Sequence, residues 1–146
     1  LGALAVGLLA TIDPIEQINK GRDSSLQSQV REYYNANLRY YVPQQQYAMM
    51  TAPITANLTS NYGTASLTNL IAAGELKTNF TSAVGTANLA NIYVSSTSSD
   101  NLVVCYQPIS KSFKSSPGAM YNNVGASEAT CKANGGTSLT CSICFK

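Results

Sequence analysis

The most constraining feature of the sequence is the apolar run LGALAVGLLATI at residues 1–12, which contains no charge and one polar side chain, Thr11. As a helix this run covers about 18 Å, whereas a membrane-spanning helix needs roughly 20 apolar residues. It is apolar on every side of a helix rather than along one stripe. We therefore expect part of a longer membrane or polymer-core helix. The alternatives are a buried core helix and a signal-peptide remnant, although no basic region precedes the run and no cleavage site follows it.

The next four residues, Asp13-Pro14-Ile15-Glu16, have the pattern of a helix start. The Asp13 carboxylate can accept hydrogen bonds from the unpaired N–H groups of a first turn, and proline fits the first helical position. Glu16 stands three residues after the cap, as in a capping box. The sequence therefore predicts that a helix begins at Asp13 and that the apolar helix before it is bent or interrupted.

Apolar side chains then recur at mostly helical spacing until Pro43 ends the pattern. They are Ile15, Ile18, Leu26, Val30, Tyr33, Tyr34, Leu38 and Tyr41. We expect an N-terminal helix over residues 1–42, with an apolar part at 1–12 and an amphipathic part at 13–42. The charged residues of the amphipathic part are expected on its solvated face.

Residues 43–146 are predicted to form a small head. Residues 43–65 are uncharged and turn-rich and predict a surface loop. Residues 66–77 predict a short helix capped by Ser66, with a buried stripe of Leu67, Leu70, Ile71 and Leu76. Alternating patterns at 91–95, 102–106 and 139–145 predict strands of a sheet within about 90–146. The expected fold class is α+β, a long N-terminal helix packed on a small antiparallel sheet.

Four cysteines, Cys105, Cys131, Cys141 and Cys144, lie near the C-terminal end. Two structural disulfides are expected if the chain is exported. Cys141 and Cys144 would face opposite sides of a strand, which leaves Cys105 and Cys131 as their partners in either order. A zinc site would favour two CxxC pairs, and a redox CxxC would favour a helix start, so these are the lesser alternatives.

Composition narrows the functional class. The chain has 11% charged residues, against roughly 25% in ordinary soluble domains, a net charge of +2 and no His. Imidazole bases, His-dependent nucleophiles and His metal ligands are therefore excluded. No carboxylate pair has a spacing suited to acid–base catalysis, so we expect no enzyme, no cofactor and no metal site. Lys111 and Lys114 stand near several aromatic residues, where a solvated loop is a simpler interpretation than a DNA-binding patch.

Several segments together resemble a known family. The stretch LGALAVGLLATIDPIEQINKGRDSS resembles the N-terminal helix of type IV pilins and of type II secretion pseudopilins, in the variant found in small-genome candidate-phyla bacteria. The stretch LTNLIAAGELK is similar to the segment that leads into the pilin sheet, and VVCYQPISKSFKS and CSICF are similar to its C-terminal part. The methylated mature N-terminus of the family and its nearby Glu have no counterpart here, and about a dozen residues are expected to precede Leu1.

The resemblance implies a structural subunit that is held in the inner membrane and then polymerises into an extracellular filament on the bacterial surface. Its partners would be copies of itself, the pilus assembly machinery and a host-cell surface or DNA, with no small-molecule substrate. The alternatives are a secretion pseudopilin and a membrane-tethered module that does not polymerise. The residues expected to pack in the polymer are Leu1, Gly2, Leu4, Val6, Leu8, Leu9 and Ile12.

Overall fold

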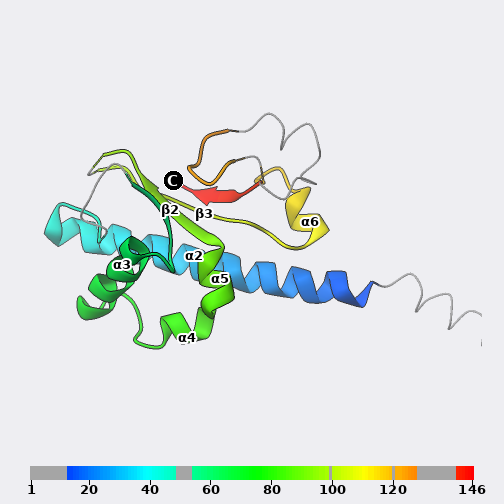
Figure 1. The fold of residues 1–146 in the computed structure, drawn as a ribbon, viewed down its shortest axis with the longest axis horizontal. Helices are drawn as coiled ribbons and strands as arrows, with labels where there is room; N and C mark the ends of the chain where they lie inside the picture. The colour runs from blue at the N-terminus through cyan, green and yellow to red at the C-terminus, as the bar shows by residue number, and fades with distance from the viewer. Residues whose placement is uncertain (1–12, 49–53, 99, 120, 128–140) are drawn as a thin grey trace, which may run out of the picture.

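A computed structural model describes residues 13–48, 54–98, 100–119, 121–127 and 141–146. The fold is α+β, with one long helix running beside a four-stranded antiparallel sheet in the order β1-β2-β3-β4. In the view of Figure 1 the short helices α3 (Asn61–Ala72) and α4 (Phe80–Val84) lie below the long helix and α5 (Thr86–Ala90) lies near its middle, whereas α6 (Lys111–Lys114) lies beside its first half. The expected residues 1–12 and the predicted break before Asp13 fall outside the described residues.

The long helix α2 spans Pro14–Gln44. Leu26, Val30 and Tyr33 are buried at helical spacing and form the stripe that packs on the sheet, as the apolar pattern predicts. The helix continues through Pro43, which the sequence placed at its end. Gln45 adopts a left-handed conformation with φ 56° and donates its N–H to the carbonyl of Tyr41, and this closes the last turn.

The sheet packs its inner face against α2. Its strands are β1 (Ile54–Asn57), β2 (Ile92–Ser96), β3 (Val103–Tyr106) and β4 (Ile143–Phe145). Val94 in the centre pairs with Ala56 on one side and with Val104 on the other. Ile92, Val94, Val104 and Tyr106 are fully buried. The prediction of a loop throughout 43–65 is wrong, because β1 lies within it. The strand β1 forms by pairing with β2, which lies about 40 residues further along the chain, so the local sequence of β1 does not indicate a strand.

The helix α3 spans Asn61–Ala72, five residues earlier than the segment that the sequence predicts. Ser60 caps it, since the hydroxyl of Ser60 accepts a hydrogen bond from the N–H of Gly63 at 3.2 Å. The predicted cap, Ser66, is instead buried inside the helix, where its hydroxyl forms a 2.6 Å hydrogen bond with that of Tyr33. The expected stripe is mostly buried: Leu67, Leu70 and Leu76 are buried, and Ile71 is half-buried.

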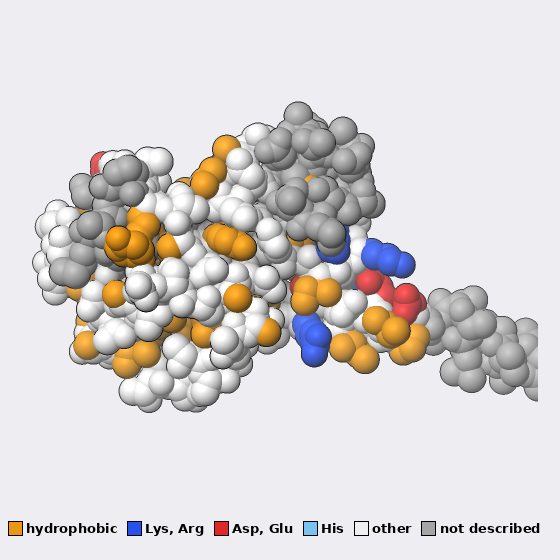
Figure 2. Space-filling model, in the orientation of Figure 1, with side chains coloured by type: hydrophobic (Ala, Val, Ile, Leu, Met, Phe, Trp, Pro, Cys, Tyr) orange, Lys and Arg blue, Asp and Glu red, His pale blue; other side chains and the backbone are white. Residues whose placement is uncertain are grey.

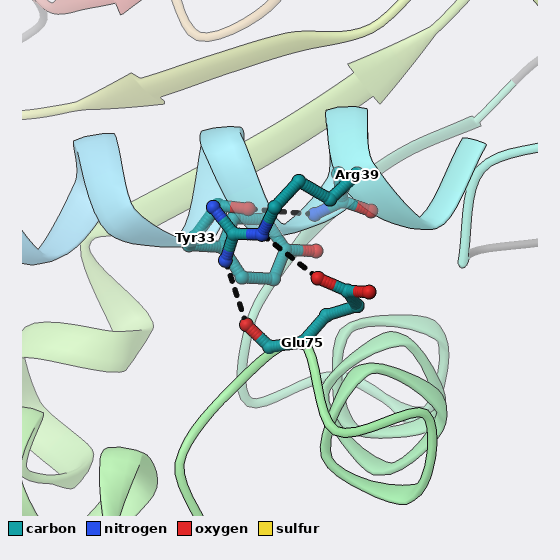
Figure 3. Close-up of polar contacts among 4 residues, drawn as sticks. Tyr33, Arg39 and Glu75 are labelled. Atoms are coloured by element: carbon teal, nitrogen blue, oxygen red, sulfur yellow. Dashed lines mark hydrogen bonds and ion pairs between the residues drawn. The ribbon is translucent and has the colours of Figure 1, made fainter. Parts of the chain in front are cut away.

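Arg39 joins α2 to the turn after α3 (Figure 3). Its Nε lies 2.8 Å from a carboxylate oxygen of Glu75, and its Nη2 donates to the Glu75 carbonyl, also at 2.8 Å. The short helices α4 (Phe80–Val84) and α5 (Thr86–Ala90) lead from this turn into β2. The buried side chains of Phe80 and Val84 connect them to the core. The one-turn helix α6 (Lys111–Lys114) follows β3.

Candidate functional site

The first turns of α2 project beyond the head (Figure 1). Asp13 has an extended backbone, and its carboxylate accepts hydrogen bonds from the N–H groups of Ile15 at 3.1 Å and Glu16 at 3.2 Å. Pro14 occupies the first helical position, where the lack of an N–H has no consequence. Asp13 and Pro14 therefore start the helix as the sequence predicts.

Glu16 does not complete a capping box. Its two carboxylate oxygens accept hydrogen bonds from the backbone N–H groups of Lys111 at 3.2 Å and Ser112 at 3.1 Å. These donors belong to the first turn of α6, whose N–H groups have no partner within that short helix. The sequence prediction for Glu16 is thus corrected: its carboxylate holds a distant segment instead of the start of its own helix.

Asp23 makes the same kind of contact and departs further from the expectation of a solvated charge. Its side chain is fully buried, and its carboxylate accepts hydrogen bonds from the N–H of Ile109 at 2.9 Å and of Ser110 at 2.7 Å. Together Glu16 and Asp23 bind four consecutive backbone N–H groups, 109–112. Buried carboxylates need such donors to offset the loss of water.

The position of Asp23 in the helix contains a signal that sequence reasoning missed. Asp23 stands three residues before Leu26 and seven before Val30, which places it on the buried stripe of α2. An acidic residue on an apolar stripe indicates a partner across the interface. The partner segment, residues 109–112, could not be predicted, because no local sequence pattern links it to Asp23.

The apolar stripe of α2 continues past the head without a partner in the described part of the chain. Ile15 and Ile18 stand three residues apart, and they are 68% and 59% exposed. Figure 2 shows apolar side chains beside acidic and basic ones on this projecting end. Ile15 and Ile18 therefore form an apolar surface that the described part of the chain leaves exposed.

Tyr106, the last residue of β3, is also buried. The Tyr106 hydroxyl has no hydrogen-bond partner among the described residues. Burial raises the pKa of Tyr106, the negative charge of Asp23 raises it further, and Arg31 lowers it. Because Tyr106 is buried, its ring is not accessible for stacking on a nucleic-acid base beside Lys111 and Lys114.

The cysteines bear out the expectation of disulfides. Cys105 and Cys144 are direct partners in the β3–β4 register and form a disulfide with an S–S distance of 2.07 Å. Cys141 is also disulfide-bonded, and Cys131 lies outside the described residues. A disulfide between Cys105 and Cys144 contradicts both the four-thiolate zinc site and a redox pair made by Cys141 and Cys144.

Within the described part of the chain, no group of three or more His, Cys, Asp or Glu side chains is placed to bind a metal ion. None of the helices within those same residues has the length and apolar character needed to cross a membrane. The residues expected to pack in a polymer, Leu1 to Ile12, lie outside the described ranges.

In comparisons with known proteins, no protein-family model, curated protein or solved structure matches this chain.

Proposed function

We propose that this chain is a structural subunit that polymerises through its N-terminal helix into an extracellular filament of the type IV pilus kind. The observation that carries the proposal is the exposure of Ile15 and Ile18 on the projecting end of α2. They continue the apolar run of residues 1–12 beyond the head. A helix of this design buries its apolar surface in a membrane before assembly and against neighbouring copies afterwards.

The chain has a packed head and a projecting helix end, and this arrangement supports the proposal. The second half of α2 is packed into the head, so the head retains its fold whatever the projecting end contacts. Glu16 and Asp23 hold residues 109–112 against the helix where it leaves the head, which fixes the direction of the projecting end. A fixed direction is what a helical polymer requires of each subunit, since small errors in orientation add up along the filament.

The proposal also covers the localisation of the subunit and its partners. The subunit would lie in the inner membrane before assembly, interact with the pilus assembly machinery, and then form part of a filament on the bacterial surface. Adhesion, surface motility and DNA uptake are the uses that the family resemblance implies. We propose no catalytic role and no cofactor, because the chain has no His and its carboxylates are scattered.

The experiment is electron microscopy of material sheared from cells that express the full chain with Ile15→Glu or Ile18→Glu. Each substitution places a charge on the exposed apolar face, so we expect filaments to be lost. Both side chains are mostly exposed, and thermal unfolding of the head should therefore be unchanged. Leu8→Asp tests the apolar run itself.

Val42→Glu is the matched control, because Val42 is 71% exposed at the other end of the same helix. Filaments that persist with both Ile15→Glu and Ile18→Glu would contradict the proposal. Short periplasmic pieces without surface filaments would favour a secretion pseudopilin. A monodisperse species in detergent, with no polymer in cells, would favour a membrane-tethered module.

A further inference from the structure

A groove lies where the second half of α2, the turn between β2 and β3 and the C-terminal residue meet. Its narrower part has a volume of about 320 Å³. That volume is within the range of about 300–1,000 Å³ found for small-ligand sites. The residues that line this part are Tyr34, Tyr47, Asp100, Asn101, Leu102, Val103 and Lys146. None of them contributes to the projecting end of α2, so the groove is independent of the proposed filament contact.

Two half-buried tyrosine rings form one wall of the groove, and each is supported by a second aromatic ring. Tyr34 packs on Phe145 with ring centroids 6.1 Å apart, and Tyr47 packs on Tyr41 with centroids 4.8 Å apart. Burial raises the pKa of Tyr47, and the charges of Tyr34, Tyr41 and Asp100 raise it further, which places these groups near one another. The rings are therefore held as fixed, flat surfaces.

The lining of the groove also includes polar groups. Asp100 is exposed, and its carboxylate accepts a 2.6 Å hydrogen bond from the Ser98 hydroxyl. Asn101 beside it is exposed and offers both a donor and an acceptor. Lys146 also lines the groove, but its ammonium group lies 4.1 Å from the ring centroid of Tyr121, which is not part of the lining. With one side-chain carboxylate and one side-chain ammonium, the lining has no excess of cations, which disfavours a polyanion such as a nucleic acid.

The narrower part continues into a wider one of about 560 Å³. The two parts share Asn101, Val103 and Lys146. The lining of the wider part includes Thr55 and Thr97, which are exposed, and Ser95 and Ser96, which are buried. The hydroxyls of Thr55 and Ser95 hydrogen-bond each other, and that of Ser96 donates to the carbonyl of Ser98. The groove therefore has aromatic rings at one end and two exposed threonines at the other, which suits an elongated ligand rich in hydroxyl groups.

We propose that this groove binds a neutral oligosaccharide. The C–H faces of a sugar ring would stack on Tyr34 and Tyr47, where aromatic rings provide apolar contact at low entropic cost. Asp100 and Asn101 would hydrogen-bond the hydroxyls of that sugar, since a carboxylate accepts and an amide both donates and accepts. The next sugar units would lie along Thr55 and Thr97, which are exposed in the wider part.

The test uses the full chain in a detergent without a sugar headgroup, because an alkyl glycoside would compete for the groove. The probes are three neutral trisaccharides: maltotriose, cellotriose and tri-N-acetylchitotriose. Binding is followed by saturation-transfer NMR and by titration. We expect saturable binding of at least one probe. Asp100→Ala and Tyr47→Ala should each weaken it about tenfold, the equivalent of one charge-assisted hydrogen bond or one stacking contact.

Tyr62→Ala is the matched control, because Tyr62 is 53% exposed on α3 and does not line the groove. It should leave the affinity unchanged. Asp100→Ala keeps the test valid if Tyr47→Ala unfolds the head, since Asp100 is exposed. The proposal is overturned if none of the probes binds, or if Asp100→Ala weakens binding no more than Tyr62→Ala does. Either result leaves the filament proposal untouched, because filaments are assayed separately.

Discussion

The carboxylate of Asp23 accepts a 2.7 Å hydrogen bond from the backbone N–H of Ser110, 87 residues further along the chain. Both residues are fully buried. This contact joins the point where α2 leaves the head to the segment that follows β3. It shows that an apparently ordinary charge on an amphipathic helix acts as a connection between distant parts of the fold.

Replacing Asp23 by Asn is expected to destabilise the head by about 3 kcal/mol. In the native chain Oδ2 of Asp23 accepts from both N–H groups and Oδ1 also accepts from that of Ile109. Asn replaces one of these oxygens by an NH₂ group that faces N–H donors, and it turns the remaining charge-assisted hydrogen bonds into weaker neutral ones. Denaturant unfolding of the full chain in detergent, followed by circular dichroism, measures the change. Glu32→Gln is the control, because Glu32 is an exposed carboxylate on the same helix and should shift stability by less than about 0.5 kcal/mol. A loss below about 1 kcal/mol for Asp23→Asn would refute the role assigned to it.

Gly21 in α2 and Gly63 in α3 provide a second prediction, because replacement by Ala should change the stability in opposite directions. A Cβ at Gly63 would collide with the carbonyl oxygen of Asn57, and that oxygen belongs to backbone which cannot easily move. A Cβ at Gly21 meets nothing within 4 Å. Gly63→Ala is therefore expected to cost about 2 kcal/mol or more, whereas Gly21→Ala should stabilise by about 0.5–1 kcal/mol. Thermal unfolding of the two variants compares them, and the same sign for both would show that the close approach of α3 to β1 is absent.

Local signals in the sequence predicted much of this fold. Asp13 and Pro14 start α2, and Leu26, Val30 and Tyr33 of its apolar pattern are buried. The same pattern also included Leu38, which is exposed, and it did not include Tyr40, which is buried. The strands β2 and β3 lie within one residue of the expected ranges. Each of these features depends on side chains close together in the chain, which is why pattern alone was sufficient.

Contacts between distant segments were not predictable. The strand β1 is stabilised by pairing with β2, and its own four residues carry no strong pattern. Ser66 appeared to be a helix cap because serine favours that position, yet the hydroxyl of Tyr33 binds it inside the core. The sequence left the partner of Cys144 open between two cysteines, and the β3–β4 register selects Cys105.

The candidate site likewise has features that were visible in the sequence and features that depend on contacts between distant segments. The apolar character of Ile15 and Ile18 was visible in the sequence, but their exposure was not, because it depends on where the head ends. The groove combines residues from α2, from the β2–β3 turn and from the C-terminus. No spacing rule brings Tyr34, Asp100 and Lys146 together, so only the folded chain reveals the groove.

The link between Arg39 and Glu75 gives a third prediction. The Arg39 side chain is 53% exposed, so its ion pair with the Glu75 carboxylate is screened by water and is worth about 0.2–1 kcal/mol. Arg39 also donates to the Glu75 carbonyl. Glu75→Gln keeps that second bond and is expected to cost less than about 0.5 kcal/mol, whereas Arg39→Ala removes both and should cost about 1–1.5 kcal/mol. Urea unfolding compares the two, with Arg22→Ala as the control for an exposed cation of α2. Equal losses from Arg39→Ala and Glu75→Gln would mean that the carbonyl bond contributes nothing.

Alkaline pH provides the last prediction, through the buried Tyr33. Burial raises the pKa of Tyr33 to about 12 from its ordinary value of 10.0, while hydrogen bonds to Ser66 and Asn37 lower it. The neutral phenol is thus favoured in the folded state. Its contribution to stability is complete below about pH 10, where the unfolded chain is still protonated, and is lost as the pH rises toward about 12.

The expected loss from Tyr33 is about 1.4 kcal/mol by about pH 11, because this pH lies about one unit above the pKa of tyrosine in the unfolded chain while the folded chain still holds the proton. Tyr33→Phe removes this pH dependence but costs about 1 kcal/mol near neutral pH, because the Ser66 hydroxyl loses its buried partner. The stability difference between wild type and Tyr33→Phe should therefore shrink or reverse between about pH 8 and about pH 11. Guanidinium unfolding at both pH values measures it. Tyr62→Phe, at an exposed tyrosine, should keep a constant difference from wild type. A Tyr33→Phe difference that stays equally constant would mean that the Tyr33 hydroxyl ionises as easily in the folded chain as in the unfolded one.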